Sequence, residues 1–153
     1  MKKLSVTLMC GLPGSGKTTY IQNFKKPEID VVSLDEIRRT VFGHTFHRDA
    51  EPWILAFGKS MATLLLKQNR SIIIDAINIL PVMRGTWRTL ADQYGASTEL
   101  VLVDVPLSIC KKRNRGRPKD QRVPNKVLED YACMFHIPNF ECEQYDKVIR
   151  LKE

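Results

Sequence analysis

Short apolar runs alternate along this chain with longer stretches that mix apolar and polar residues. Brief apolar runs bounded by polar or turn-forming residues are typical of buried strands. The sequence has them at residues 4–10, 30–34, 71–75, 99–105 and 147–151. Stretches with apolar residues at helical spacing lie between them, notably at residues 17–24, 51–68, 81–94, 106–114 and 125–134. The pattern therefore predicts strands and helices in alternation.

Alternation of this kind predicts an α/β fold with one parallel sheet, helices on both faces and right-handed crossovers. In such a sheet the ligand binds at the carboxyl ends of the strands. The loops that follow Cys10, Leu34, Asp75 and Val105 should therefore border one crevice. The chain of 153 residues is long enough for one core and has no internal repeat or low-complexity linker, so we expect one domain over residues 1–153.

A complete phosphate-binding loop occupies the turn between the first predicted strand and the first predicted helix. It matches the pattern G-x-x-x-x-G-K-[ST] and consists of Gly11, Leu12, Pro13, Gly14, Ser15, Gly16, Lys17, Thr18 and Thr19. The glycines let backbone N–H groups turn toward a phosphate, and the start of the helix adds its positive dipole end. Lys17 would then reach the β and γ phosphates of ATP, while the Thr18 hydroxyl ligates Mg²⁺. A glycine-rich turn without a ligand would explain neither the Lys-Thr pair nor the strand-loop-helix setting.

Composition argues against several other classes of protein. The chain has no apolar run of 18 residues and no N-terminal signal-peptide pattern, so we expect a cytoplasmic protein without a membrane partner. Its four cysteines have the spacing of neither a zinc site nor a redox pair. We therefore expect reduced and mostly buried thiols.

The positive charge of the chain is concentrated in one segment. Residues 111–126 hold eight basic side chains and one acidic side chain, a net of +7, which equals the formal net charge of the whole chain. A concentrated cationic segment attracts phosphates, whether those of a nucleotide, of a nucleic acid or of both. Beside a phosphate-binding loop, that role is favoured over a merely solvated run of charges.

Charged side chains follow the second and third predicted strands, where the crevice is expected. Asp35 and Arg38 are three residues apart at the start of a predicted helix, hence on one face. A carboxylate there can take a proton from an acceptor hydroxyl, and an arginine can hold an anionic group of the acceptor. The alternative is a helix-capping aspartate with an i,i+3 ion pair. Asp75 ends the third strand, the place of an acidic residue that acts near Mg²⁺ or orients a catalytic arginine, unless it is an ordinary turn residue.

The ordered set of motifs resembles the kinase domain of bacteriophage polynucleotide 5′-kinase and its relatives among small phosphate-loop kinases. The resemblance covers nearly the whole chain. Its motifs are, in order, the loop at residues 11–19, Asp35-Glu36-Ile37-Arg38, Asp75-Ala76-Ile77-Asn78, Val103-Asp104-Val105-Pro106, Lys112-Arg113-Asn114 and Arg122-Val123-Pro124. The resemblance implies a P-loop NTPase fold of three α/β/α layers, with a five-stranded parallel sheet and an arginine-rich helical lid at about residues 113–124. It also implies the cytoplasm of a bacterium or of a phage-infected host as the location.

On the donor side, the resemblance implies that the phosphate-binding loop and Arg113 bind ATP or another nucleoside triphosphate. Lys17 and Thr18 would hold the triphosphate and its Mg²⁺. A lid arginine would stabilise charge on the transferring phosphoryl group, because phosphoryl transfer depends on positioning and cationic stabilisation. Arg117 and Arg122 both have a suitable place in the lid sequence, and the spacing does not choose between them.

On the acceptor side, the resemblance implies that Asp35 is the general base on the acceptor hydroxyl and that Arg38 binds the acceptor's phosphate. Asp75 and Asn78 would complete the acceptor site, with Asp75 supporting either Arg38 or that site. Relatives usually carry a threonine before this asparagine, and here the position is Ile77. An apolar side chain there removes a hydrogen bond to the acceptor phosphate, so the donor is easier to infer than the acceptor.

Three functions remain open from the sequence. The first is a polynucleotide 5′-hydroxyl kinase, with a nucleic acid or a nucleotide as its acceptor. The second is a kinase of the same fold for another hydroxyl, on a small metabolite, an antibiotic, a nucleotide sugar or a hydroxymethyl base in phage DNA. The third is a nucleotide-binding switch without transfer, against which Asp35 and Arg38 argue, because a switch needs no base beside its triphosphate.

Two pairs of residues have an ordinary structural explanation. His44 and His47 lack a third metal ligand nearby in the sequence, which favours a polar loop. Trp53 and Trp87 each lie within an apolar helical pattern, which favours the core over a platform for stacking bases.

Overall fold

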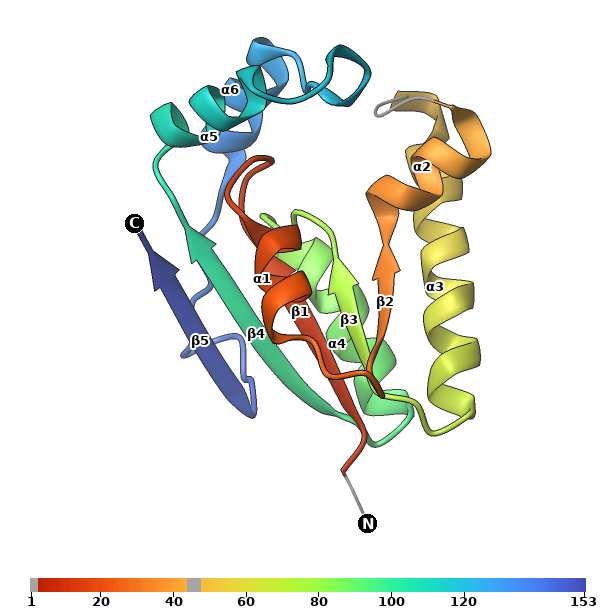
Figure 1. The fold of residues 1–153 in the computed structure, drawn as a ribbon. Coiled ribbons are helices and arrows are strands. Elements are labelled where there is room, and N and C mark those ends of the chain that lie inside the picture. The colour runs from red at the N-terminus through yellow and green to blue at the C-terminus, as the bar shows by residue number, and fades with distance from the viewer. Residues whose placement is uncertain (1–2, 44–47) are drawn as a thin grey trace.

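One five-stranded parallel sheet forms the centre of the molecule (Figure 1). The computed structural model describes residues 3–43 and 48–153, so His44 and His47 lie outside the described residues. The strands are β1 (Ser5–Cys10), β2 (Asp30–Ser33), β3 (Ile72–Asp75), β4 (Ser97–Asp104) and β5 (Lys147–Lys152). Their order in the sheet is β2-β3-β1-β4-β5, and every neighbouring pair is parallel. The predicted fold class is confirmed, with strand ends within two residues of those expected.

Six α-helices occur among the described residues. They are α1 (Lys17–Phe24), α2 (Leu34–Phe42), α3 (Glu51–Lys67), α4 (Pro81–Gln93), α5 (Leu107–Arg115) and α6 (Asn125–Met134). Two single turns of 3-10 helix add to them, η1 (Arg48–Ala50) and η2 (Lys119–Gln121). Pro81 begins α4, and prolines directly precede α5 and α6, where a missing N–H leaves no helical hydrogen bond unmade.

Alternate residues of the central strands fill two separate cores. One set of apolar side chains packs with residues of α2, α3 and α4 on one face of the sheet; it includes Val6, Leu8, Ile72, Ile74, Leu100 and Leu102. The intervening residues pack with Ile21 of α1 on the other face; they include Met9, Ile73, Val101 and Val103. Burial on both faces explains why these strands are continuous apolar runs. The molecule therefore has the three α/β/α layers that the sequence predicts (Figure 1).

The carboxyl ends of β1, β2 and β3 lie together below the helical segment formed by α5, η2 and α6 (Figure 1). The packing of α3 against α2 fixes the first turn of α2 at this edge. A Cβ added at Gly58 of α3 would lie 2.5 Å from Cδ2 of Leu34, so with any other residue here the Leu34 side chain would have to shift. Leu34 immediately precedes Asp35, and the close packing therefore helps to place that carboxylate.

The two tryptophans differ in environment. Trp87 is 1% exposed and belongs to the core, as predicted. Trp53 is 66% exposed, so its predicted burial is wrong. The reason is that α3 carries apolar residues around most of its circumference, and Ile54, Gly58, Ala62 and Leu66 form the buried side. Trp53 faces away from them.

The prediction of reduced and mostly buried cysteines is confirmed in part. All four are free thiols, but only Cys10 and Cys110 are buried, while Cys133 and Cys142 are exposed. Within residues 3–43 and 48–153, no helix has the length and apolar character needed to span a membrane.

Candidate active site

The phosphate-binding loop joins β1 to α1 in the backbone form that its glycines allow. Gly14 and Gly16 have φ values of 80° and 107°, a region that side chains strongly disfavour. A Cβ on Gly11 would lie 2.8 Å from both Oγ of Ser15 and the carbonyl oxygen of Val103. The Gly11 N–H donates to the carbonyl oxygen of Ile77 at 2.9 Å, which ties the loop to the segment after β3. The loop is therefore held against two strand ends.

Lys17 is enclosed by this loop. Its ammonium donates to the carbonyl oxygens of Gly11 and Leu12, each at 2.9 Å, and the residue is only 8% exposed. Burial lowers the pKa of Lys17, while the negative charges of Asp75 and Asp35 oppose that effect. A buried cation held only by backbone carbonyls inside a loop of N–H groups is suited to receive a phosphate.

Ser15 gives independent support for a ligand in the loop. Its hydroxyl is buried, and it has no hydrogen-bond partner among the described residues. Buried polar groups in folded proteins are nearly always hydrogen-bonded. The loop therefore fits an anionic group that would accept this hydrogen bond. Pro13 and Thr19 also line the cleft beside the loop.

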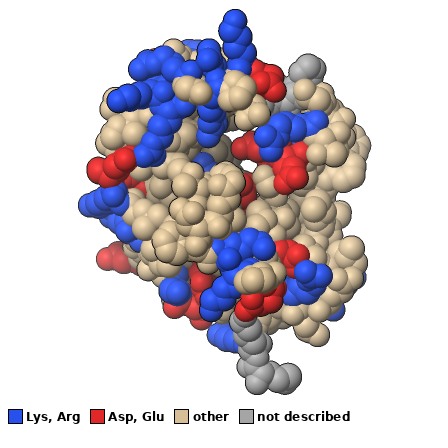
Figure 2. Space-filling view, in the orientation of Figure 1, with Lys and Arg blue, Asp and Glu red and all other residues tan. Residues whose placement is uncertain are grey.

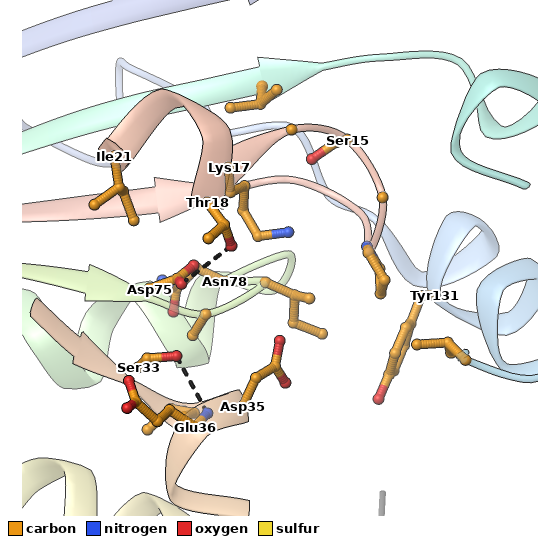
Figure 3. A pocket seen from close by; sticks show the side chains of 18 of the residues that line it. Ser15, Lys17, Thr18, Ile21, Ser33, Asp35, Glu36, Asp75, Asn78 and Tyr131 are labelled. Atoms are coloured by element: carbon orange, nitrogen blue, oxygen red, sulfur yellow. Dashed lines mark hydrogen bonds between the residues drawn. The ribbon is translucent and has the colours of Figure 1, made fainter. Parts of the chain in front are cut away.

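Thr18 and Asp75 lie side by side at the start of α1 and the end of β3. The Thr18 hydroxyl donates to Oδ2 of Asp75 at 3.4 Å (Figure 3). Burial raises the pKa of Asp75, and the charge of Lys17 opposes this. A hydroxyl and a carboxylate are hard oxygen ligands of the kind that Mg²⁺ binds together with phosphates and waters. These two residues fit a magnesium ion at the donor phosphates.

Asp35 lies in the first turn of α2 and points into the same cavity as Lys17 (Figure 3). It is not the cap of the helix, because the Ser33 hydroxyl accepts the Glu36 N–H at 3.3 Å and fills that role. The Asp35 side chain is 73% exposed. Its carboxylate is therefore accessible to a substrate.

Arg38 lies between two carboxylates. One terminal nitrogen, Nη1, donates to Oδ1 of Asp35, as the spacing predicted. Nε and Nη2 donate to the two carboxylate oxygens of Glu51 at 2.6 and 2.7 Å. Burial opposes the charge of Arg38, but the hydrogen bond to Glu51 and the charges of Asp35 and Glu51 outweigh it and raise the pKa of Arg38. Among the described residues, Asp75 is not a hydrogen-bond partner of Arg38.

Two residues near Asp35 and Arg38 were not predicted from the sequence. Glu51 is the first residue of α3, and Tyr131 comes from α6; neither belongs to a motif. Tyr131 faces Asp35 across the cavity (Figure 3). Burial raises the pKa of Tyr131, as does the nearby charge of Glu51. The packing of α3 on α2 brings Glu51 here, and the position of α6 across the cleft brings Tyr131, so no local sequence signal could have found them.

Asn78 has a different environment from the charged residues. It is buried, its side-chain amide donates to the carbonyl oxygen of Met9 at 2.8 Å, and its φ is 48°. Its own carbonyl oxygen accepts a hydrogen bond from Arg84 at 2.9 Å. These bonds make Asn78 a residue that holds the β3–α4 segment against β1. Ile77, its neighbour, lines the cleft.

The lid residues differ in where they point. Arg117 lines the cleft, and its positive charge contributes to the lowered pKa of Lys17. Arg122 instead donates from Nε to the carbonyl oxygen of Arg117 at 2.7 Å and is not among the residues that line the cleft. Asn114 joins the two ends of the lid loop, because its amide donates to the Val123 carbonyl oxygen at 2.7 Å and its Oδ1 accepts the Val123 N–H at 3.0 Å. Arg117 is therefore the lid arginine nearer the phosphate-binding loop.

Arg113 lies behind the phosphate-binding loop. Its Nη1 donates to the carbonyl oxygen of Ser15 at 2.9 Å, and its Nη2 donates to both carboxylate oxygens of Glu153 at 2.7 Å. It also lines the cleft. The guanidinium thus fixes the lid helix α5 to the back of the loop.

One cleft of about 1590 Å³ is lined by the predicted site residues except Gly11 and Arg122. Space-filling atoms show it as a hollow between the segment of α5, η2 and α6 and the side formed by α2 and α3 (Figure 2). Lys and Arg side chains gather over the first of these walls, where residues 111–126 carry their net charge of +7. Acidic and basic side chains both occur on the opposite wall (Figure 2). Lys17 and Asp35 face this cavity from two different strand ends.

Known proteins share this architecture. The sequence model of a family described as AAA domain matches residues 6–138. A chain of the Pnkp1/Rnl/Hen1 RNA repair complex is similar in fold, with a TM-score of 0.75 and 22% identity over 88% of this chain; the present chain spans only 44% of that chain's length. A putative kinase from Chloroflexus aurantiacus has a TM-score of 0.76 and 14% identity, covering 99% of this chain and 89% of that one. The Mycobacterium tuberculosis APS kinase CysC, in complex with AMPPNP and APS, has a TM-score of 0.65 and 20% identity, covering 98% and 90%. The fold is that of P-loop kinases.

Proposed function

The chain belongs to the AAA domain family, and from that membership and the geometry of its cleft we propose that it is an ATP-dependent kinase. The proposed acceptor is the 5′-hydroxyl of a polynucleotide or of a 3′-nucleotide. The single observation that carries the proposal is that Asp35 and Arg38 line the same cavity as Lys17. A nucleotide switch needs only the lysine, whereas a transferase needs a base and an acceptor-binding group beside it.

The donor half of the proposal rests on the phosphate-binding loop. Lys17 and the loop N–H groups would hold the triphosphate of ATP, and the unpartnered Ser15 hydroxyl would bond to it. Thr18 and Asp75 would hold Mg²⁺, which neutralises charge on the donor phosphates when it is bound. The structures of similar proteins with AMPPNP or with ADP-AlF3 support a nucleotide at this place.

The acceptor half rests on the first turn of α2. The acceptor hydroxyl would lie beside Asp35, which takes its proton as the oxygen attacks the γ phosphorus. A new oxygen–phosphorus bond then forms, the bond from the γ phosphorus to the bridging oxygen breaks, and ADP leaves. Arg38 would bind the acceptor's own phosphate, because guanidinium pairs well with phosphate oxygens. Arg117 would place its positive charge near the transferring group.

A nucleic acid acceptor is favoured by the concentrated charge of residues 111–126 and by the RNA repair complex among the similar structures. One observation favours a second candidate, a kinase for a small hydroxyl compound. Apolar side chains, including Ile77, Met83 and Leu55, line part of the cleft, and Ile77 stands where a hydroxyl would help bind an acceptor phosphate. The similar APS kinase and gluconokinase structures fit that candidate.

A transfer assay with γ-labelled ATP separates these candidates. The acceptors are 5′-hydroxyl DNA and RNA oligonucleotides, a 3′-nucleotide, hydroxymethyluracil DNA and common metabolites. We expect label on the oligonucleotides and the 3′-nucleotide, and we expect Lys17→Ala to abolish it. The variant should stay folded, since the hydrogen bonds of the Lys17 ammonium to described residues go to loop carbonyls alone. Label on a metabolite alone would support the second candidate, and wild-type turnover by Lys17→Ala would contradict the donor assignment.

A further inference from the structure

Glu51 accepts more hydrogen bonds from Arg38 than any other described side chain does. Its two carboxylate oxygens accept hydrogen bonds from Nε and Nη2 at 2.6 and 2.7 Å. This is the bidentate side-on geometry of an arginine–carboxylate pair, which fixes the plane of the guanidinium as well as its place. The Arg38 side chain is only 16% exposed, so the pair is largely shielded from water.

The remaining N–H groups of Arg38 determine what else it can bind. A guanidinium has five N–H donors, one on Nε and two on each terminal nitrogen. Glu51 uses one on Nε and one on Nη2, and Asp35 uses one on Nη1. One N–H therefore remains on each terminal nitrogen. Nη2, and Nη1 once the Asp35 carboxylate turns to the acceptor hydroxyl, can therefore bind an oxyanion while Glu51 keeps its two hydrogen bonds.

We propose that Glu51 is the positioning residue of the acceptor site: it orients Arg38 so that the terminal nitrogens face an acceptor phosphate. The inference rests on the proposed kinase function and names the residue on which its acceptor preference depends. Asp75 does not share this role, because its hydrogen bond goes to Thr18 on the donor side. The two carboxylates thus serve opposite halves of the cleft.

The location of Glu51 suits this role. It is the first residue of α3, which packs against α2 with the Leu34 side chain close to Gly58. Arg38 lies one turn after Asp35 on α2. The same guanidinium also contacts Asp35, so Glu51 and Asp35 hold it from two sides.

The test compares Glu51→Gln with a matched control. Glutamine keeps the size of the side chain but presents an NH₂ group to a cation. Asp30→Asn is the control, because Asp30 accepts a hydrogen bond from Nη2 of Arg70 at 2.8 Å at the opposite end of β2 from the site. We expect Glu51→Gln to lower kcat/KM for a 3′-phosphorylated nucleoside about 10- to 100-fold, mostly through the acceptor KM. The KM for ATP and the rate with the free nucleoside should change little, and Asp30→Asn should change neither acceptor.

A second readout does not depend on catalysis. The Nε–Hε resonance of Arg38, observed by NMR, should be well resolved in the wild-type and Asp30→Asn proteins and averaged by exchange in Glu51→Gln. If the resonance and the preference for the 3′-phosphate both survive in Glu51→Gln, the positioning role is wrong. If Glu51→Gln lowers kcat/KM equally for both acceptors and also lowers the Tm, Glu51 has a purely structural role, and the proposal is likewise wrong. If the wild-type protein labels none of these acceptors, the proposed function fails, and the NMR result alone then decides whether Glu51 fixes Arg38.

Discussion

At the scale of single residues, hydrogen-bond partners separate side chains that the sequence left equivalent. Asp35 and Asp75 are both aspartates at strand ends, but Asp35 is exposed beside Arg38, while Asp75 is buried beside Thr18. Ser33 caps α2, which leaves the Asp35 carboxylate without a capping duty. The two acids therefore have different chemistry to offer, one toward an acceptor proton and the other toward a metal ion.

The proposed role of Asp35 as general base predicts a specific kinetic defect. Asp35→Asn keeps the shape of the side chain but cannot accept a proton, so kcat should fall about 10²-fold or more with the affinity for ATP nearly unchanged. Glu36→Gln is the matched control, because it removes the other carboxylate from the first turn of α2. Steady-state kinetics and ATP titrations measure both effects. Loss of ATP binding by Asp35→Asn, with a normal rate at saturation, would make Asp35 a donor-site residue.

The buried state of Asp75 predicts a dependence of stability on pH. Burial raises its pKa above the ordinary value of 3.8, so folding favours the protonated acid. Asp75 therefore contributes stability below its ordinary pKa, and that contribution is lost as the pH rises through the raised pKa of the folded state. Asparagine does not ionise.

Relative to Asp75→Asn, the wild-type protein should thus lose free energy of unfolding as the pH rises from below 3.8 toward neutrality. Urea denaturation of both proteins at a series of pH values measures the difference. A difference that stays constant, or that grows in favour of the wild type, would show that the charge of Lys17 outweighs burial at this position.

At the scale of elements, the sequence predicted what depends on local pattern. The central strands β1, β3 and β4 have nearly continuous apolar runs because both faces of the sheet are buried there, and the phosphate-binding loop has a distinctive order of glycines. Contacts between elements could not be predicted from the sequence. Glu51 meets Arg38 only because α3 packs on α2, and the exposure of Trp53 depends on which side of an apolar helix faces the sheet.

The lid shows the same limit, since two arginines fitted its sequence equally well. The Arg122 side chain turns back onto the lid, where it donates a hydrogen bond to the carbonyl oxygen of Arg117. The Arg117 side chain lines the cleft. Arg117→Ala should lower kcat by about 10³-fold, the lower end of the effect of a transition-state arginine. Arg122→Ala, its matched control, should have a much smaller effect. Rapid-quench measurement of the transfer step distinguishes them, and the reverse order would assign the role to Arg122.

At the scale of the whole molecule, the carboxyl ends of the strands collect groups from α1, α2, α3 and the lid into one cleft. The charge is divided unevenly around it, because residues 111–126 account for the net charge of the chain. For an oligonucleotide acceptor that contacts about three phosphates, affinity should fall on the order of 10-fold between 50 and 200 mM salt. A free nucleoside should show little such slope in the same KM measurements, and a flat response for both would show that the basic segment does not contact the acceptor.

The most direct measurement of the central claim compares two acceptors with the wild-type protein. Arg38, oriented by Glu51, is proposed to bind the phosphate next to the nucleoside whose 5′-hydroxyl reacts. A charge-assisted bidentate contact of this kind contributes about 1.5–3 kcal/mol, or about one to two decades in kcat/KM. Initial rates of transfer from γ-labelled ATP should therefore favour a 3′-phosphorylated nucleoside over the free nucleoside by about 10- to 100-fold. Equal use of the two acceptors would contradict the account and point to a kinase for a small, uncharged hydroxyl compound.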